Sequence, residues 1–531
     1  MANDLTPRRD FLRIATAGLA GSALSAHPAA AQPKAPTARP PSGAHNVRDY
    51  GATGDGSTID SPAIDKAIEA AAANGGGTIL FPAGNYLSYS IHLKSHVALY
   101  LDQGAAIVAA PPLPAGTPGG YDLAEPQNPA IEPYQDYGHN HWHNSLIWGE
   151  DIHDFSILGP GTIWGKGLSR GWKANDGPTA ETPGVANKAI ALKNCHNVNL
   201  RDFTILHGGH FGILATGVDN LVIDNLVIDT NRDGMDIDCC RNVRVSNCSV
   251  NSPYDDGICP KSSFALGYAR ATEFVTISDC FVSGMVEGSL ADGTYKPFGG
   301  TGRIKFGTES NGGFRNITVS NCVFYNCNGL ALETVDGALL EDVTITNISM
   351  RDIVNAPIFL RLGSRMRGPA GVPVGTLKRV TISNIVASGS SAKVSSLISG
   401  IPGHPIEDLK LSNIHIHHQG GGTAEQAALL LPEKENGYPE PSMFGDTPSQ
   451  GFYFRHVKGL EANDIKITSE KEDARPAFVL QDVENAEFFH INAAGAPTGE
   501  TFALNNVTNF SLAGSRPLAD TIVDQADKKN I

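Results

Sequence analysis

The 531-residue sequence has 41% hydrophobic content, enough to bury a large core, and its 58 glycines favour a turn-rich β protein over a helical one. Its formal charge of −15 argues against nucleic acid as a partner, because phosphate binding draws on surplus Lys and Arg. The charge does not exclude an acidic sugar polymer, since a local basic cleft can lie on an acidic surface.

The N-terminus is typical of an export signal. The pair Arg8-Arg9 precedes an apolar stretch from Ile14 to about Leu24, and three alanines at 29–31 offer a cleavage site. The paired arginines indicate the twin-arginine route. We therefore predict a signal peptide at 1–31 and an exported protein, periplasmic or secreted.

After the signal, the sequence predicts a short tether and one folded domain. Residues 32–44 are rich in Pro and Ala and are expected to be a disordered linker. The folded domain is expected to span 45–531. No later run approaches the roughly 18 apolar residues of a membrane helix, so we expect no membrane attachment once the signal is removed.

The first predicted element of the domain is an amphipathic helix through Ala73. Ser61 is the expected N-cap, Pro62 stands at the first helical position, and Asn74-Gly75 marks the end. Two predicted strands follow, at 77–82 and 97–101. A helix in this place would cover the open end of a stack of strands.

A strand phrase of alternating apolar and polar residues, ending in Asn or Asp, then repeats along the chain. The alternation predicts a strand with one buried face, and the final Asn or Asp suits a left-handed bend. The phrases begin at Val198, Leu221, Val243, Val275, Ile317, Val343, Val380, Leu409 and, more weakly, Leu460.

This repeat predicts an all-β fold, a single-stranded right-handed parallel β-helix with an N-terminal capping helix. The first spacings are 23 and 22 residues, the size of one coil with several short strands, and the longer spacings indicate inserted loops. Leucine-rich repeats share the period but need a leucine-dense signature, which is missing. The segment after about Thr468 is expected to be an irregular C-terminal cap.

Acidic residues recur in step with these coils. Asp233 and Asp255 each lie eight residues after the Asn that ends their phrase, so we expect them at the same position on adjacent coils, about 4.8 Å apart. Asp256 adds a third acid. By the same count Glu287 falls one coil later and His210 one coil earlier.

A column of acids favours acid and base catalysis on a glycosidic bond. Stacked like charges raise some pKa values, and a glycosidase needs one protonated and one ionised carboxyl group. The alternative is that Asp233 and Asp255 merely occupy Asp-Gly turns. Four acids in register favour the catalytic interpretation.

At these residues the sequence resembles the family 28 glycoside hydrolases, the polygalacturonases and their relatives. Asn231–Asp236 resembles the family's Asn-Thr-Asp-Gly block, and Asp255–Ile258 with Lys261-Ser262 resembles its double-Asp block. The likeness runs from about Val47 to about residue 420. It implies that Asp255 is the general acid, while Asp233 and Asp256 position and deprotonate water in an inverting hydrolysis.

The sequence departs from the family at two later blocks. No histidine stands at 285–288 or 300–302, where Gly-His-Gly is expected, and the Arg-Ile-Lys block aligns with Ala331–Glu333, which loses its charges. Arg303 and Lys305 stand one coil too early. Strand alternation places both on one face, where they would grip a substrate carboxylate or, alternatively, be solvated.

The departures leave several substrate-binding candidates. They are Glu287 as a substitute for the histidine, together with Arg303, Lys305, His210, Lys261, Glu333 and Arg361, the last in a loop of three arginines at 361–367. The expected substrate is a pectic or related acidic poly- or oligosaccharide, galacturonan-like or rhamnogalacturonan-like.

Long insertions around 109–140, 165–187 and 418–450 favour chain-end attack. Histidines at 139–143 resemble a metal cluster without a complete ligand set, so we expect no metal and no cofactor.

Two other functions remain open. A β-helix polysaccharide lyase would need a Lys or Arg base, which the Asp trio does not supply. A noncatalytic carbohydrate-binding solenoid would explain the missing His, Arg and Lys.

The sequence indicates no oligomeric state. It does predict reduced core cysteines, because Cys195, Cys248, Cys280 and Cys322 recur in the strand phrase.

Overall fold

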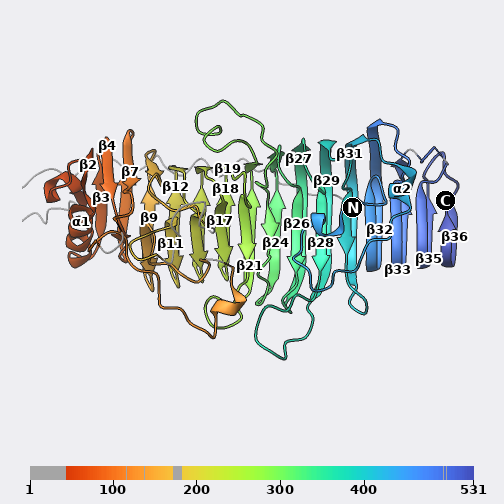
Figure 1. The fold of residues 1–531 in the computed structure, drawn as a ribbon, viewed down its shortest axis with the longest axis horizontal. Helices are drawn as coiled ribbons and strands as arrows, with labels where there is room; N and C mark the ends of the chain where they lie inside the picture. The colour runs from red at the N-terminus through yellow and green to blue at the C-terminus, as the bar shows by residue number, and fades with distance from the viewer. Residues whose placement is uncertain (1–42, 115–116, 137, 172–181, 494, 498) are drawn as a thin grey trace, which may run out of the picture. The chain divides into compact units, whose positions relative to one another are not determined.

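The computed structural model describes residues 43–531 except 115–116, 137, 172–181, 494 and 498. The predicted signal peptide and nearly all of the linker lie outside the described residues. Within them, no helix has the length and apolar character needed to cross a membrane. Residues 43–531 form one unit, in which strands stack coil upon coil (Figure 1).

The strands form rows in which each strand pairs with the strand one coil away. One row contains β5 (Ile91–His92), β8 (Ile147–Glu150), β11 (Lys188–Lys193), β14 (Phe211–Thr216), β17 (Asp233–Asp238), β20 (Ile258–Lys261), β23 (Lys305–Phe306), β26 (Leu330–Thr334), β28 (Ile358–Leu362) and β30 (Ser396–Ser399). A second row contains β1 (Ala44–Asn46), β3 (Gly77–Phe81), β6 (Val97–Leu101), β9 (His153–Leu158), β12 (His196–Arg201), β15 (Asp219–Asp224), β18 (Arg241–Ser246), β21 (Thr272–Ser278), β24 (Phe314–Ser320), β27 (Leu339–Arg351), β29 (Thr376–Ser390) and β31 (Ile406–Gly420).

A third row contains shorter strands, and the last strands span more than one row. The short strands are β2 (Asp55–Ile59), β4 (Gly84–Ser88), β7 (Ala105–Ala109), β10 (Thr162–Trp164), β13 (Thr204–Leu206), β16 (Val227–Asp229), β19 (Ser249–Asn251), β22 (Phe281–Ser283) and β25 (Val323–Tyr325). The last strands are β32 (Phe452–Lys471), β33 (Phe478–Phe489), β34 (Asn492–Ala493), β35 (Phe502–Ala513) and β36 (Thr521–Asn530). The helices are η1 (Val47–Tyr50), α1 (Ser61–Ala73), η2 (Glu132–Tyr134), α2 (Ala424–Ala427) and η4 (Pro441–Phe444).

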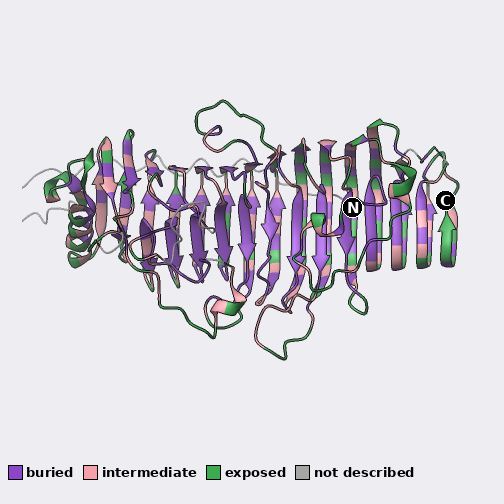
Figure 2. Ribbon diagram, in the orientation of Figure 1, coloured by how far each residue is buried: buried purple, intermediate pink, exposed green. Residues whose placement is uncertain are grey.

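The fold confirms the predicted right-handed parallel β-helix. Every pairing between these strands is parallel except that of β35 with β36. The repeated phrases lie in exact register with one another, from Val198 opposite Leu221 to Leu409 opposite Leu460. Their apolar residues point inward to one continuous core, and Figure 2 shows the strands largely buried while the long connections are exposed.

The Asn or Asp that ends each phrase adopts the left-handed conformation that the sequence predicts. Asn225 has φ 56° and Asn247 has φ 57°. The side chains also bond from coil to coil, since the Asn225 amide donates to Asp202 Oδ1 at 2.9 Å. The bend thus combines a tolerated positive φ with a hydrogen bond between neighbouring coils.

Replacing Asn225 with Ala should therefore lower the free energy of unfolding more than replacing it with Gly. The Ala variant loses the hydrogen bond and takes on left-handed strain, together about 2–3 kcal/mol, while the Gly variant loses about 1 kcal/mol with the bond. Urea unfolding of the two variants measures the difference. Equal stability of the Ala and Gly variants would contradict the role given to φ.

The helix predicted near the N-terminus is present as α1. It begins at Ser61, with Asp60 and not Ser61 at the N-cap position. The Asp60 side chain makes no cap hydrogen bond, and its carboxylate accepts from the Thr53 amide at 2.7 Å. Its buried face packs on β3 and β5. Its role as a cover for the first coil stays a prediction.

The cysteines are buried and unpaired, as the strand phrase predicts. All eight lie among the described residues, and none forms a disulfide. They take the place of small apolar residues along the core, for example Cys195 and Cys248.

The prediction of an irregular segment after Thr468 is wrong. The coils continue through β33 and β35, where Phe478 lies opposite Phe502 with their rings stacked 4.8 Å apart. The antiparallel strand β36 then pairs with β35. Sequence reasoning missed these coils because Phe and Ala replace the Val and Ile of the earlier phrase, and because the bend that ends the phrase falls on His490 and Gly514, which keep the positive φ without an Asn or Asp.

Candidate active site

The three acids of the sequence prediction meet at the start of neighbouring strands. Asp233 begins β17, and Asp255 and Asp256 lie three and two residues before the start of β20. One oxygen from each of the three carboxyl groups lies within 4.8 Å of the others. The coil repeat therefore does bring these acids together.

Their register differs by one residue from the prediction. Met235 lies opposite Ile258, which places Asp233 opposite Asp256 and not opposite Asp255. On the preceding coil, Phe211 lies opposite Asp233, so His210 falls beside Arg232. The coil between β17 and β20 has one more residue than the count from the Asn bends allowed for.

The glycine after Asp233 is explained by close packing of the backbone and not by a turn. The amide of Gly234 donates to Asp256 O at 2.9 Å, and a Cβ at Gly234 would collide with Gly257 O and with Val250. Gly234 is a strand residue with ordinary φ. The Asp-Gly turn interpretation is therefore wrong for Asp233.

A small cavity opens onto the three carboxyl groups. Its volume is about 100 Å³, on the order of three water molecules at ~30 Å³ each. It is lined by Asp136, His139, His210, Arg232, Asp233, Asp255, Asp256, Lys261, Lys305 and Tyr438. The cavity therefore has room for the reacting atoms and an attacking water, while most of a sugar ring would lie outside it.

Two of the long insertions predicted from the sequence, around 109–140 and 418–450, supply part of this lining. Asp136 and His139 come from the connection between β7 and β8, and Tyr438 comes from the connection between β31 and β32. Sequence analysis did not predict these three as site residues. The only signal was the histidine cluster at 139–143, which we interpreted as an incomplete metal site.

The three acids have divergent pKa values. Burial raises the pKa of Asp233 well above its usual range, and the neighbouring Asp236 and Asp255 carboxylates add to the shift. Burial also raises the pKa of Asp255, although the Arg232 guanidinium, which is ion-paired with it, opposes the rise. The cavity thus favours the protonated form of these two acids.

Asp256 is the opposite case. Burial would raise its pKa, but Lys305, Arg303 and Lys261 outweigh burial and lower it to about 2. Arg303 Nε donates to Asp256 Oδ1 at 2.8 Å, and Lys305 Nζ lies 3.2 Å from Oδ2. Near neutral pH the site therefore contains one firmly ionised carboxylate beside two carboxyl groups that retain protons more readily.

Lys261 occupies the floor of the site. It is 4% exposed, and its ammonium lies 3.3 Å from Glu309 and 3.8 Å from Asp236. His139 Nε2 lies 3.0 Å from the same Asp236. Burial and the Lys261 charge would lower the pKa of His139, but the Glu309 and Asp236 carboxylates outweigh them and raise it.

Arg303 and Lys305 face the site, as strand alternation predicted, and are 1% and 3% exposed. The alternative that they are solvated is wrong. Besides Asp256, both contact Glu440 from the connection between β31 and β32: Arg303 binds it with two hydrogen bonds, and Lys305 Nζ lies 3.8 Å away. Each cation thus already has carboxylate partners within the chain.

Glu333 lies on the next coil, where Lys305 pairs with Ala331. The Glu333 side chain is fully buried, with Lys305 Nζ 3.8 Å away. Burial raises the pKa of Glu333 to about 8, with Lys305 and Arg303 opposing the rise. Glu333 is therefore largely protonated at neutral pH and adds little charge to the site.

Glu287 does not lie in the column of acids. Residues 284–299 leave the coil and return where the Gly300 amide donates to Gly284 O at 2.9 Å, and the coil resumes at Ile304, opposite Ile258. Glu287 instead pairs with Arg170 and His207, each at 2.8 Å. The prediction that Glu287 continues the column is wrong, because the insertion carries it away.

Of the two remaining binding candidates, one lines the cavity and the other does not. His210 lines the cavity, and burial lowers its pKa well below the usual range, so the ring is neutral. Arg361 does not line the cavity; its guanidinium donates to Ser399, Gly400 and the backbone of the connection between β31 and β32. The arginines at 365 and 367 are likewise paired, with Asp336 and Glu309, and do not form a solvated loop.

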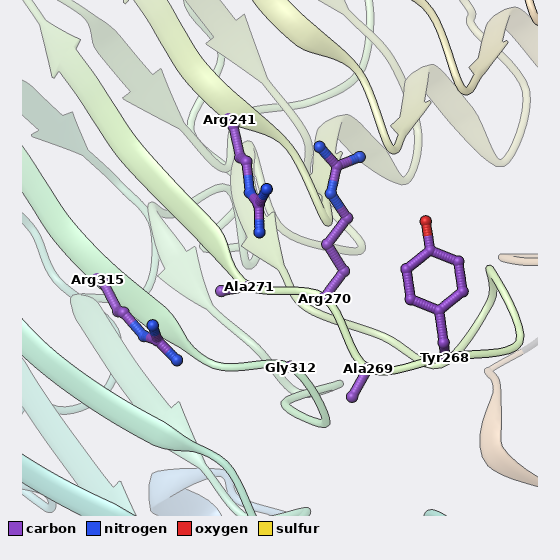
Figure 3. Close-up of a pocket in the computed structure, with 7 residues that line it drawn as sticks. All are labelled: Arg241, Tyr268, Ala269, Arg270, Ala271, Gly312 and Arg315. Atoms are coloured by element: carbon purple, nitrogen blue, oxygen red, sulfur yellow. The ribbon is translucent and has the colours of Figure 1, made fainter.

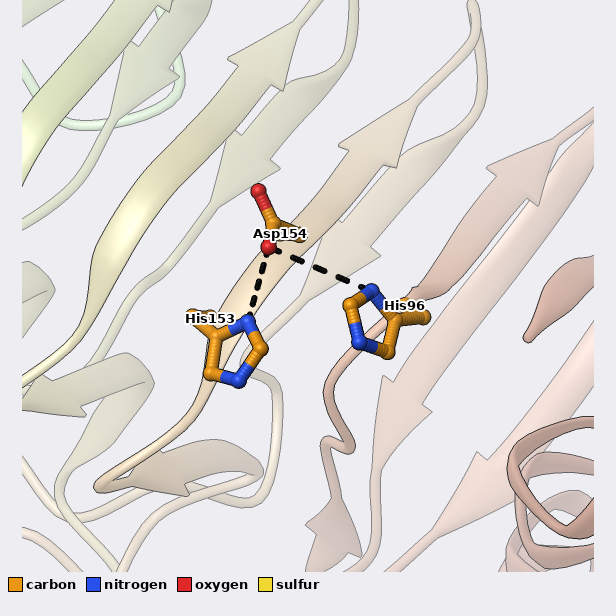
Figure 4. Close-up of side chains that lie close together, drawn as sticks. All are labelled: His96, His153 and Asp154. Carbon is orange, nitrogen blue, oxygen red and sulfur yellow. Dashed lines mark hydrogen bonds and ion pairs between the residues drawn. The ribbon is translucent and has the colours of Figure 1, made fainter. Parts of the chain in front are cut away.

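Several groups of side chains present three metal-ligand atoms close together. Two lie at the site, one formed by His139, Asp233 and Asp236 and the other by the three predicted acids. A third, formed by His96, His153 and Asp154, lies on the surface, where the Asp154 carboxylate joins the two rings (Figure 4). Among the three acids, Asp255 already pairs with Arg232, and Asp256 with Arg303 and Lys305.

A second cavity, of about 540 Å³, lies outside the carboxylate site. Its lining is Arg241, Tyr268, Ala269, Arg270, Ala271, Gly312 and Arg315 (Figure 3). Arg241 pairs with Glu273 at 2.8 Å, and Arg270 pairs with Asp219. Most of its positive charge is therefore already neutralised within the chain.

Comparisons with known proteins find similarity to one family of glycosyl hydrolases. A family model described as "Glycosyl hydrolases family 28" matches residues 131–266, which include the Asp233 coil and the double acid. A probable polygalacturonase of Vitis vinifera is 24% identical over 397 residues, covering 70% of this chain and 73% of that protein. These matches show that the chain is similar to glycosyl hydrolase family 28, from which it diverges. A second model, "Rhamnogalacturonase A/epimerase, pectate lyase-like", matches residues 44–110.

Solved structures share the fold of this chain. The family 28 exopolygalacturonase of Yersinia enterocolitica superposes with a TM-score of 0.60 at 19% identity, over 86% of this chain and 79% of that one. An exopolygalacturonase of Thermotoga maritima gives 0.55 at 17% identity, over 92% and 95%. These likenesses show that the chain has the right-handed parallel β-helix fold of these structures.

Proposed function

We propose that this chain hydrolyses glycosidic bonds in a pectic poly- or oligosaccharide, with Asp255 as general acid and with Asp256 and Asp233 holding the attacking water. The observation that carries the proposal is the meeting of three carboxyl groups with divergent pKa values in one cavity. A glycosidase needs a proton donor and an ionised base at the same bond. The names of the relatives and the family supply the substrate class.

The reaction follows from these protonation states. Asp255, whose pKa is raised, donates its proton to the glycosidic oxygen as the bond between that oxygen and the anomeric carbon breaks. Asp256, whose pKa is about 2, accepts a proton from the water whose oxygen forms the new bond to the anomeric carbon. Asp233 lies beside Asp256 and orients the water. One sugar gains the hydroxyl group and the other leaves with the donated proton.

Inversion is proposed on the family resemblance and not on the spacing of the carboxyl groups. Their nearest oxygens lie within 4.8 Å, closer than the separation of about 6.5–9.5 Å typical of inverting pairs. Whether hydrolysis inverts the anomeric configuration therefore depends on where the attacking water lies relative to Asp233 and Asp256.

Product analysis tests the function directly. Incubation with homogalacturonan, rhamnogalacturonan and their oligomers should release new reducing ends with the inverted anomeric configuration, read by proton NMR at early times. Because insertions wall the cavity, we expect short products from chain ends. Ultraviolet-absorbing unsaturated ends would instead indicate a lyase using one of the cavity's cations, such as Lys261. Binding without any release would indicate a noncatalytic solenoid.

A further inference from the structure

The cations beside Asp256 hold a carboxylate of the chain itself. Glu440 lies on the connection between β31 and β32 and contacts both Arg303, 137 residues earlier in the sequence, and Lys305. The Arg303 guanidinium binds both Glu440 oxygens. This is the bidentate geometry with which a guanidinium would bind the carboxylate of an acidic sugar.

The charges around this pair are balanced without a substrate. Arg303 and Lys305 carry two positive charges, and the carboxylates of Asp256 and Glu440 carry two negative charges. Glu333 is largely protonated at neutral pH because burial raises its pKa to about 8. A sugar carboxylate placed here would add an uncompensated charge in a buried place, which is costly.

Two buried arginines hold the first part of the connection that carries Glu440. Arg361 donates to the backbone carbonyls of Glu433 and Lys434 at 3.0 and 3.1 Å, and Arg455 donates to those of Leu431 and Pro432 at 2.8 and 3.0 Å. Both arginines are 1% exposed or less. Moving this connection aside to admit an acidic sugar would break these bonds.

We infer that Glu440 is a specificity-determining residue: it occupies the carboxylate position at Arg303 and Lys305, so the sugar that lies over Lys305 is neutral. This rests on the proposed function and narrows its substrate. One of the two sugars joined by the cleaved bond then lacks a carboxylate, within a chain that contains uronates elsewhere. Arg303 and Lys305 consequently serve to ionise Asp256 and not to grip a substrate carboxylate.

The test compares two oligosaccharides of equal length, one made only of galacturonate and one alternating galacturonate with a neutral sugar. Wild type should show the higher kcat/KM on the alternating chain. Glu440→Gln keeps the size of the side chain but removes its charge, and should raise the ratio of kcat/KM for the all-uronate chain over the alternating chain by roughly tenfold or more.

Two controls isolate the charge. Glu440→Asp keeps the carboxylate and should retain the wild-type preference. Glu435→Gln removes an exposed carboxylate from the same connection and should leave the ratio unchanged.

The outcomes separate the inference from the function on which it rests. A wild type that prefers the all-uronate chain overturns the inference and leaves the hydrolase intact. An unchanged ratio in an active Glu440→Gln variant does the same. Absence of cleavage of either chain by wild type overturns the proposed function itself. The ratio of kcat/KM for the two chains in wild type tests the inference even if a Glu440 variant fails to fold.

Discussion

Asp255→Asn should slow hydrolysis of a natural pectic chain by about 10²–10⁴-fold while largely sparing an aryl glycoside with a good leaving group. The reason is that a good leaving group departs without a proton, so it does not need the general acid. Asp256→Asn should slow both substrates by a similar factor, because the attacking water loses its base in either case. Initial rates on the two substrates measure this difference.

The same experiment distinguishes Asp255 from Asp233 as the acid. Burial raises the pKa of both, and that of Asp233 is well above its usual range. If Asp233→Asn showed the dependence on the leaving group and Asp255→Asn slowed both substrates alike, the two roles would be exchanged. Asp527→Asn, on exposed β36, is the matched control and should leave both rates unchanged.

Lys305→Met should move the acid limb of the pH–kcat profile upward by about 1–3 units. Lys305 and Arg303 hold the pKa of Asp256 down to about 2 against burial, so removing one cation raises it. The base form of Asp256 exists above that pKa. Activity is therefore lost as pH falls through it, and the loss in the variant begins at a higher pH.

The lowered pKa of Asp256 also affects the pH at which the protein unfolds. A lowered carboxyl pKa stabilises the folded state above the unfolded value of about 3.9, and this stabilisation is lost as pH falls toward 2. The Lys305→Met variant should therefore unfold at a higher pH on acidification. Circular dichroism at each pH separates unfolding from the catalytic shift. Lys305→Arg keeps the charge and should retain the wild-type acid limb; a limb that moves equally in both variants would reject the electrostatic explanation.

The repeat and the three acids show how much of the structure short stretches of sequence can predict. The strand phrases were predicted with their register, because alternating apolar residues and an Asn bend are properties of a few adjacent residues. The same count brought Asp233, Asp255 and Asp256 to neighbouring coils. It was one residue wrong in their pairing because the number of residues between bends differs among coils, as the Met235–Ile258 register shows.

Amino-acid sequence by itself determined the β-helix, its coil register and the meeting of three acids, since each depends on a short periodic pattern. Only the tertiary structure decided that Glu287 leaves the column, that His139 and Tyr438 enter the cavity, and that Glu440 neutralises Arg303. The physical reason is that inserted connections carry no periodicity relating them to the coils. Their side chains are positioned by contacts with residues more than a hundred places away in sequence, such as the one between Arg303 and Glu440.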